Sequence, residues 1–127
     1  EMARQLARDH GANIVAVARR ADRLKELEEE LAPTGVKVLS LVADLSDVGD
    51  VDRVVEEVTR GEPLYAAILN AGVTHFGEWL ELGWDGFRRM LDTNVVGVVR
   101  MTTRLLPYLE ERGEGGGLML VSSMAGL

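Results

Sequence analysis

Two clusters of polar and small residues follow apolar strands of the predicted fold. Ser122 and Ser123 come directly after the apolar run 118–121, and the triplet Asn70-Ala71-Gly72 follows the run 64–69. Parallel α/β sheets bind their ligands at the carboxyl ends of the strands. A serine hydroxyl held there can donate a hydrogen bond to a developing alkoxide, and small residues let a flat ligand approach the backbone. The two clusters predict one shared crevice.

Charged residues follow two other predicted strands. Arg19 and Arg20 come after strand 14–18, where dinucleotide-binding folds often place an acid for the ribose 2′-hydroxyl, and where an arginine can bind a 2′-phosphate instead. They can equally be solvated residues at a helix start. Asp44 follows strand 36–42; it can accept from an adenine amino group with Leu45 against the ring, or it can be a turn or cap residue.

Three further motifs have competing interpretations. Asn94 lies inside a long predicted helix, where its amide competes for backbone groups, so it is either a satisfied structural residue or a functional one. Ser123 can simply cap a turn, and Asn70-Ala71-Gly72 can be an ordinary turn. The residues around Ser123 do not form a G-x-S-x-G elbow and neither histidine completes a triad, which excludes hydrolysis. The glycine-rich stretch 113–117 follows a helix and opens a strand, the reverse of a phosphate loop, so we predict a connector.

Helices and strands must alternate to position these residues. Apolar periodicity predicts strands at 14–18, 36–42, 64–69 and 118–121, separated by helices at 1–10, 24–31, 47–60 and 84–111. Ser46 is the expected N-cap of the third helix. The longest helix is expected to bury one stripe, formed by Phe87, Leu91, Val95, Val98, Thr102 and Leu105. The pattern predicts parallel βαβ units in one α/β domain over residues 1–127.

Composition excludes several classes of protein. The 127 residues carry a net charge of −7 and no lysine-rich run, which argues against a nucleic-acid partner. The chain has no cysteine and two histidines, so it has no disulfide or thiol nucleophile and no His/Cys zinc site is expected. No apolar run reaches the ~20 residues that span a bilayer. Because Glu1 already lies within a helical pattern, we expect the natural protein to begin earlier.

The order and spacing of these clusters resemble the short-chain dehydrogenase/reductase family along the whole chain. The resemblance implies a Rossmann-like, doubly wound parallel sheet that binds NADP, with NAD as the other option, for hydride transfer to a small-molecule carbonyl or from an alcohol. By position, Ser123 is similar to the catalytic serine, and Asn94 to the asparagine that holds a water in a proton relay. The expected cofactor contacts are Arg19, Arg20, Asp44, Leu45, Asn70, Ala71 and Gly72.

The chain also departs from the family pattern. The family's first strand and its Gly-rich turn are absent. The Tyr-x-x-x-Lys motif is also absent, since Leu69 lies four residues after Tyr65 and Arg112 lies four after Tyr108. We therefore expect an incomplete sheet and an inactive fragment. Because the family places its missing strand in the middle, strand 36–42 should pair with 14–18 and strand 64–69 with 118–121, with the two pairs separated.

Three other expectations complete the hypothesis. The resemblance implies a cytoplasmic enzyme that forms a homo-oligomer through helix 84–111, with no membrane partner. The alternative from another class is a non-catalytic NAD(P)-binding sensor or interaction module with the same fold. A flavodoxin-like signalling domain is disfavoured, because Ala18 stands where an acidic phosphoacceptor cluster would begin.

Overall fold

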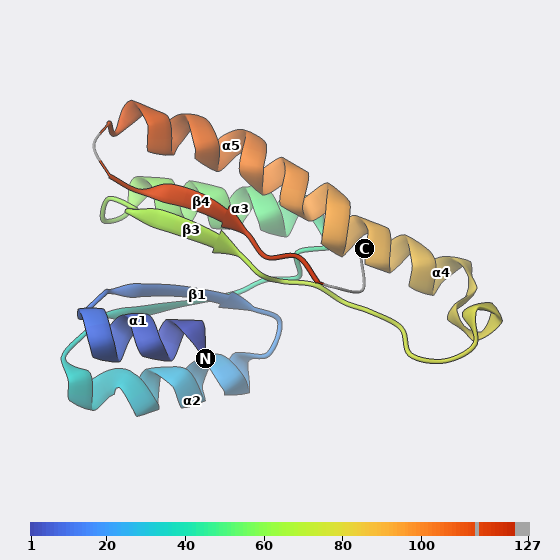
Figure 1. The fold of residues 1–127 in the computed structure, drawn as a ribbon, viewed down its shortest axis with the longest axis horizontal. Helices are drawn as coiled ribbons and strands as arrows, with labels where there is room; N and C mark the ends of the chain where they lie inside the picture. The colour runs from blue at the N-terminus through green and yellow to red at the C-terminus, as the bar shows by residue number, and fades with distance from the viewer. Residues whose placement is uncertain (114, 124–127) are drawn as a thin grey trace. The chain divides into compact units, whose positions relative to one another are not determined.

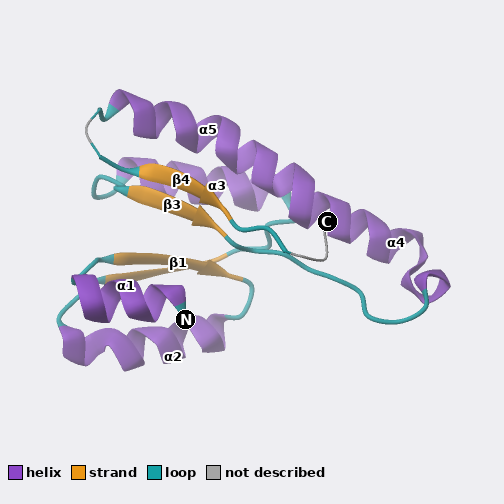
Figure 2. Ribbon diagram, in the orientation of Figure 1, coloured by secondary structure: helices purple, strands orange, loops and turns teal. Residues whose placement is uncertain are grey.

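A computed structural model describes residues 1–113 and 115–123. The chain divides into two compact units, Glu1–Asp44 and Leu45–Leu127, and each is described by itself (Figures 1 and 2). Both units combine parallel strands with helices, as the sequence predicts for an α/β protein.

The first unit is a two-stranded parallel sheet with two helices packed against it. Its elements are α1 (Met2–His10), β1 (Ile14–Ala18), α2 (Ala21–Leu31), a 3₁₀ turn (Ala32–Thr34) and β2 (Val38–Val42). The helix α1 ends at Gly11, whose left-handed φ of 63° lets its amide bond back to the Ala7 carbonyl. The apolar side chains that meet beneath the strands form the core of this unit: Ala7, Leu24, Leu31, Leu41 and Ala43.

The second unit repeats this arrangement with longer helices. Its elements are α3 (Val48–Arg60), β3 (Ala66–Leu69), α4 (Trp79–Leu91), a π-helix (Asp92–Gly97), α5 (Val98–Glu111) and β4 (Gly117–Leu120). Figure 1 shows β3 and β4 side by side, with α5 running along them, and α5 contacts β3, β4 and α3. The buried apolar residues of α3 recur at helical spacing: Val51, Val54, Val55 and Val58.

The strand pairing predicted from the sequence is confirmed. In the first unit β1 pairs in parallel with β2, from Ile14 opposite Val38 to Ala18 opposite Val42. In the second, β3 pairs in parallel with β4, from Ala66 opposite Gly117 to Leu69 opposite Leu120. Within residues 1–113 and 115–123, these pairs form two separate sheets.

The predicted buried stripe of the long helix is wrong over its first half. Phe87, Leu91 and Val95 are each at least 40% exposed, whereas Leu105 is buried as predicted. The other buried positions are Thr93, Gly97, Met101 and Leu109. The cause is the π-helix, in which the extra residue per turn rotates everything before it relative to α5. Within α4, the backbone of Gly83 has non-helical angles (φ 62°, ψ 173°), so the continuous helix begins only after this residue.

Two smaller features correct or confirm the local predictions. The N-cap of α3 is Asp47, not Ser46: the Asp47 carboxylate accepts a hydrogen bond of 2.9 Å from the Asp50 amide.

The glycine-rich stretch connects α5 to β4, as predicted. Gly116, at φ 101°, lies so close to the Tyr65 carbonyl that a Cβ atom there would overlap it.

An ion cluster fixes α3 against α5. The Asp52 carboxylate accepts hydrogen bonds of 2.7 and 2.6 Å from the Arg100 guanidinium, and Arg104 Nη1 lies 2.7 Å from the same group. The bond from Arg100 is the main cause, and that from Arg104 a further one, that lowers the pKa of Asp52 to about 2. The charge of Asp52 therefore stabilises the folded state.

We expect Asp52→Asn to lower the melting temperature by a few degrees at pH 6, because both arginines lose their anion. Because the pKa of Asp52 is lower in the folded state, its stabilising effect is complete above the pKa of the unfolded state, ~3.9. This effect is lost as the pH falls through about 2, the pKa of the folded state. Melting curves at several pH values measure the difference, which should shrink below pH 4. Glu57→Gln is the matched control, because Glu57 contacts Arg53 only at 3.9 Å. Equal effects of the two substitutions would contradict this account.

Candidate active site

In the first unit, the structure brings the predicted arginines and Asp44 to the same edge of the sheet. The Ala43 amide donates a hydrogen bond of 3.1 Å to the Ala18 carbonyl, just beyond the paired strands. Arg19 directly follows Ala18, and Asp44 directly follows Ala43. The side chain of Arg19 is exposed and that of Asp44 is half-buried. This edge therefore carries an exposed cation and a half-buried carboxylate.

Arg20 occupies the N-cap position of α2 with extended backbone angles, and its own side chain makes no cap bond. Like Arg19 it is exposed at the amino end of a helix, where the dipole favours an anion and disfavours a cation. Arg19 and Arg20 therefore place two positive charges in the sequence at the start of α2, and such charges suit a phosphate.

In the second unit, the other two clusters also share one edge. The Val121 amide donates a hydrogen bond of 3.0 Å to the Leu69 carbonyl and so extends the pairing of β3 with β4 by one step. Asn70 directly follows Leu69, and the pair Ser122-Ser123 directly follows Val121. Asn70, Ser122 and Ser123 are exposed, and Leu69 is half-buried. The remainder of the predicted serine motif, 124–126, lies outside the described residues.

Asn94 holds the segment after β3 in place. Its side-chain oxygen accepts a hydrogen bond of 2.9 Å from the Val73 amide, and its Nδ2 donates one of 2.8 Å to the Val73 carbonyl. These bonds connect the π-helix to the residue next to Gly72. A side-chain amide has two N–H donors and two acceptor lone pairs, so Asn94 retains one of each for a further partner.

The opposite end of β3 is held by α5. Tyr108 accepts a hydrogen bond of 3.2 Å from the Leu64 amide, and Arg112 donates to the Leu64 carbonyl. This contact lies before β3, whereas Asn70 lies after it, so the Tyr108 hydroxyl is at the opposite end of the strand from Asn70 and the serine pair. Tyr108 and Arg112, four residues apart, thus both bind the main chain of Leu64.

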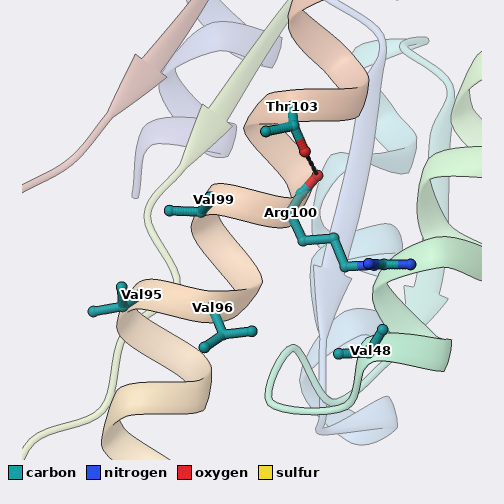
Figure 3. Close-up of a pocket in the computed structure, with 6 residues that line it drawn as sticks. All are labelled: Val48, Val95, Val96, Val99, Arg100 and Thr103. Atoms are coloured by element: carbon teal, nitrogen blue, oxygen red, sulfur yellow. Dashed lines mark hydrogen bonds between the residues drawn. The ribbon is translucent and has the colours of Figure 1, made fainter.

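An open apolar hollow of about 390 Å³ lies elsewhere in the second unit. Figure 3 shows Arg100 and Thr103 on the same helix, where the Thr103 hydroxyl donates a 2.9 Å bond to the Arg100 carbonyl. The Arg100 guanidinium is paired with Asp52, so both polar side chains that line the hollow already have hydrogen-bond partners within the chain. The hollow is lined by Val48, Val95, Val96, Val99, Arg100 and Thr103.

The described part of the chain has neither a cluster of metal-type ligands nor a membrane-crossing helix. Residues 1–113 and 115–123 contain no group of three or more His, Asp or Glu side chains placed to hold a metal ion. None of the helices in the same residues combines the length and the apolar character that crossing a membrane requires.

Comparison with known proteins gives consistent matches. The family model "short chain dehydrogenase" matches residues 1–127. The uncharacterized oxidoreductase YxnA of Bacillus subtilis is 32% identical over 123 residues, which are 96% of this chain and 35% of YxnA. The alcohol dehydrogenase of Thermococcus sibiricus, solved with 5-hydroxy-NADP, matches with a TM-score of 0.84 and 31% identity, over 96% of this chain and 52% of that one.

L-sorbose reductase of Gluconobacter frateurii, solved with NADPH and L-sorbose, has a TM-score of 0.88 and 30% identity, covering 99% of this chain and 48% of its own. The chain thus spans about half the length of these solved proteins, and the fold it shares with them is the Rossmann fold. With a family model that matches every residue, the chain belongs to the short-chain dehydrogenase family.

Proposed function

We propose that this chain is part of a longer NADP-preferring oxidoreductase that transfers hydride between nicotinamide and a small carbonyl or alcohol substrate. The observation that carries the proposal is the hydrogen bond from Val121 to Leu69, because it aligns Ser122-Ser123 with Asn70-Ala71-Gly72 at one sheet edge. The family assignment and the NADP-type ligands of two structural neighbours support the choice of cofactor.

The residues present fit such a cofactor. Arg19 and Arg20 supply donors for a 2′-phosphate, and the Asp44 carboxylate can accept from the adenine amino group beside Leu45. The exposed backbone of Asn70, Ala71 and Gly72 leaves room for a flat ligand along the second edge. When bound, the cofactor supplies or accepts the hydride. We propose that both units belong to one cofactor-binding domain.

We assign Ser123 as the donor of a hydrogen bond to the substrate oxygen. A hydroxyl fixed at the end of β4 stabilises the negative charge that develops on that oxygen and needs no reorganisation. Asn94 orders the segment of Val73 with one hydrogen bond from its Nδ2 and one to its Oδ1. We propose that the second N–H and the second lone pair of this amide hold a water for proton transfer. A group from outside these 127 residues would supply the proton.

The exposed apolar side of the long helix supports the proposed homo-oligomer. Leu91, Val95, Val99 and Leu106 are 40–55% exposed, and the hollow of Figure 3 continues this surface. A second copy is the partner we propose for it. That the enzyme is cytoplasmic stays a prediction.

An activity assay tests the proposed function. We expect the longer protein to oxidise NADPH with a panel of ketones and sugars, and we expect the 127-residue polypeptide to show no turnover, because neither of its tyrosines has a lysine four residues later. Absorbance at the nicotinamide band measures both. NADPH binding without turnover by the longer protein would contradict the oxidoreductase and favour a sensor. Turnover by the 127 residues alone would contradict our assignment of the proton donor.

A further inference from the structure

The π-helix makes a backbone contact that only glycine allows. Gly97, its last residue, is buried, and a Cβ atom at this position would overlap the carbonyl oxygen of Leu45. A flexible side chain could move aside, but this obstacle is the backbone that leads into α3. The end of the π-helix is therefore pressed directly against the segment that we propose beneath the adenine ring.

The same six-residue π-helix also reaches the second cofactor segment. Asn94, three residues before Gly97, holds the Val73 amide and carbonyl with its two bonds of 2.9 and 2.8 Å. Val73 adjoins Gly72, and a Cβ built on Gly72 would lie 3.5 Å from Asn94 Oδ1. One rigid element thus touches the chain after β2 through Gly97 and the chain after β3 through Asn94.

We propose that Gly97 is a positioning residue for the cofactor: it sets the separation between Leu45 and the segment that contains Gly72 and Val73. The inference rests on the proposed function, since it assigns both segments to one dinucleotide. A side chain at residue 97 would push the π-helix away from Leu45, and Asn94 would shift with it. The two halves of the cofactor site would then no longer match a single ligand.

Helix propensity alone predicts that Gly97→Ala stabilises the helix. The proposal predicts in addition that this substitution weakens cofactor binding. Glycine inside a helix is less favourable than alanine, so Gly→Ala normally stabilises a helix. Gly86 in α4 provides the matched control, because a Cβ there would meet only side-chain atoms of Leu82, which can rotate aside, and no backbone outside its own helix. Gly86→Ala should therefore leave cofactor binding unchanged, whereas Gly97→Ala should weaken it.

The test uses the longer enzyme and measures the dissociation constant of NADPH by fluorescence. We expect Gly97→Ala to weaken binding about tenfold or more, the scale on which small misplacements act. Hydrogen exchange of the Val73 amide in the cofactor-free variant supplies a readout that a uniform loss of stability would not reproduce. It should accelerate while the amides of α3 keep their wild-type rates. Wild-type affinity in Gly97→Ala, or a uniform acceleration of all amides, would overturn the proposal.

If Gly97→Ala does not fold, the wild-type enzyme decides the question. The ligand 2′,5′-ADP carries the adenine half of NADP and no nicotinamide, so it should slow exchange of the Val73 amide through the π-helix. Unchanged exchange at saturating 2′,5′-ADP would overturn the role of Gly97. If the wild-type enzyme binds neither NADPH nor 2′,5′-ADP, the proposed function itself is wrong.

Discussion

Arg19→Ala is expected to raise the KM for NADPH by about 10- to 100-fold, because a charge-assisted hydrogen bond contributes about 1.5–3 kcal/mol. The KM for NADH should change by less than about threefold, since NADH lacks the 2′-phosphate that we assign to this guanidinium. Steady-state kinetics of the longer enzyme with both cofactors measure this change in preference. The physical basis is the exposed position of Arg19 directly after β1 and beside the start of α2.

Arg60 provides the control for Arg19. It is also an exposed arginine, but it lies in the last turn of α3 and is 3.4 Å from Glu56. Arg60→Ala should leave both KM values unchanged. An equal loss of NADPH and NADH affinity in Arg19→Ala would show that Arg19 does not recognise the 2′-phosphate.

Ser123→Ala is expected to lower kcat by about 10²–10³-fold, the range found when one preorganised donor to a developing oxyanion is removed. The KM for NADPH should stay near the wild-type value, because the serine faces the substrate in our assignment. Rapid kinetics of hydride transfer with one ketone substrate would measure the loss in the chemical step.

The neighbouring serine is the control for this experiment. Ser122→Ala removes the same atom one residue earlier, and in an extended chain its side chain points to the other side. We expect it to change kcat by no more than about twofold. If Ser122→Ala abolished activity while Ser123→Ala retained it, the two roles would have to be exchanged.

Much of the fold could be predicted because parallel strands leave a strong local signal. The apolar runs at 14–18 and 64–69 are followed at once by polar or glycine residues, so their carboxyl ends were identifiable before any pairing was known. Strand β1 matches its predicted range, and β2 and β3 start two residues later than predicted. The pairing itself came from the family resemblance and was confirmed.

The details of the site could not be predicted, because they depend on contacts between distant residues. Asn94 was identifiable as unusual inside a helix, but its partner Val73 is 21 residues away and binds through its backbone, which has no sequence signature. The extra residue of the π-helix likewise rotated Phe87, Leu91 and Val95 out of the predicted buried stripe. Gly97 did carry a signal, since glycine is disfavoured inside helices, but only the contact with Leu45 explains it.

A crystal structure of the longer protein with NADP⁺ tests the central claim most directly. The account predicts that one cofactor molecule contacts Arg19 and Asp44 from the first unit and Gly72 from the second, with Ser123 beside the nicotinamide. A cofactor bound to one unit alone, or Ser123 far from the nicotinamide ring, would contradict it.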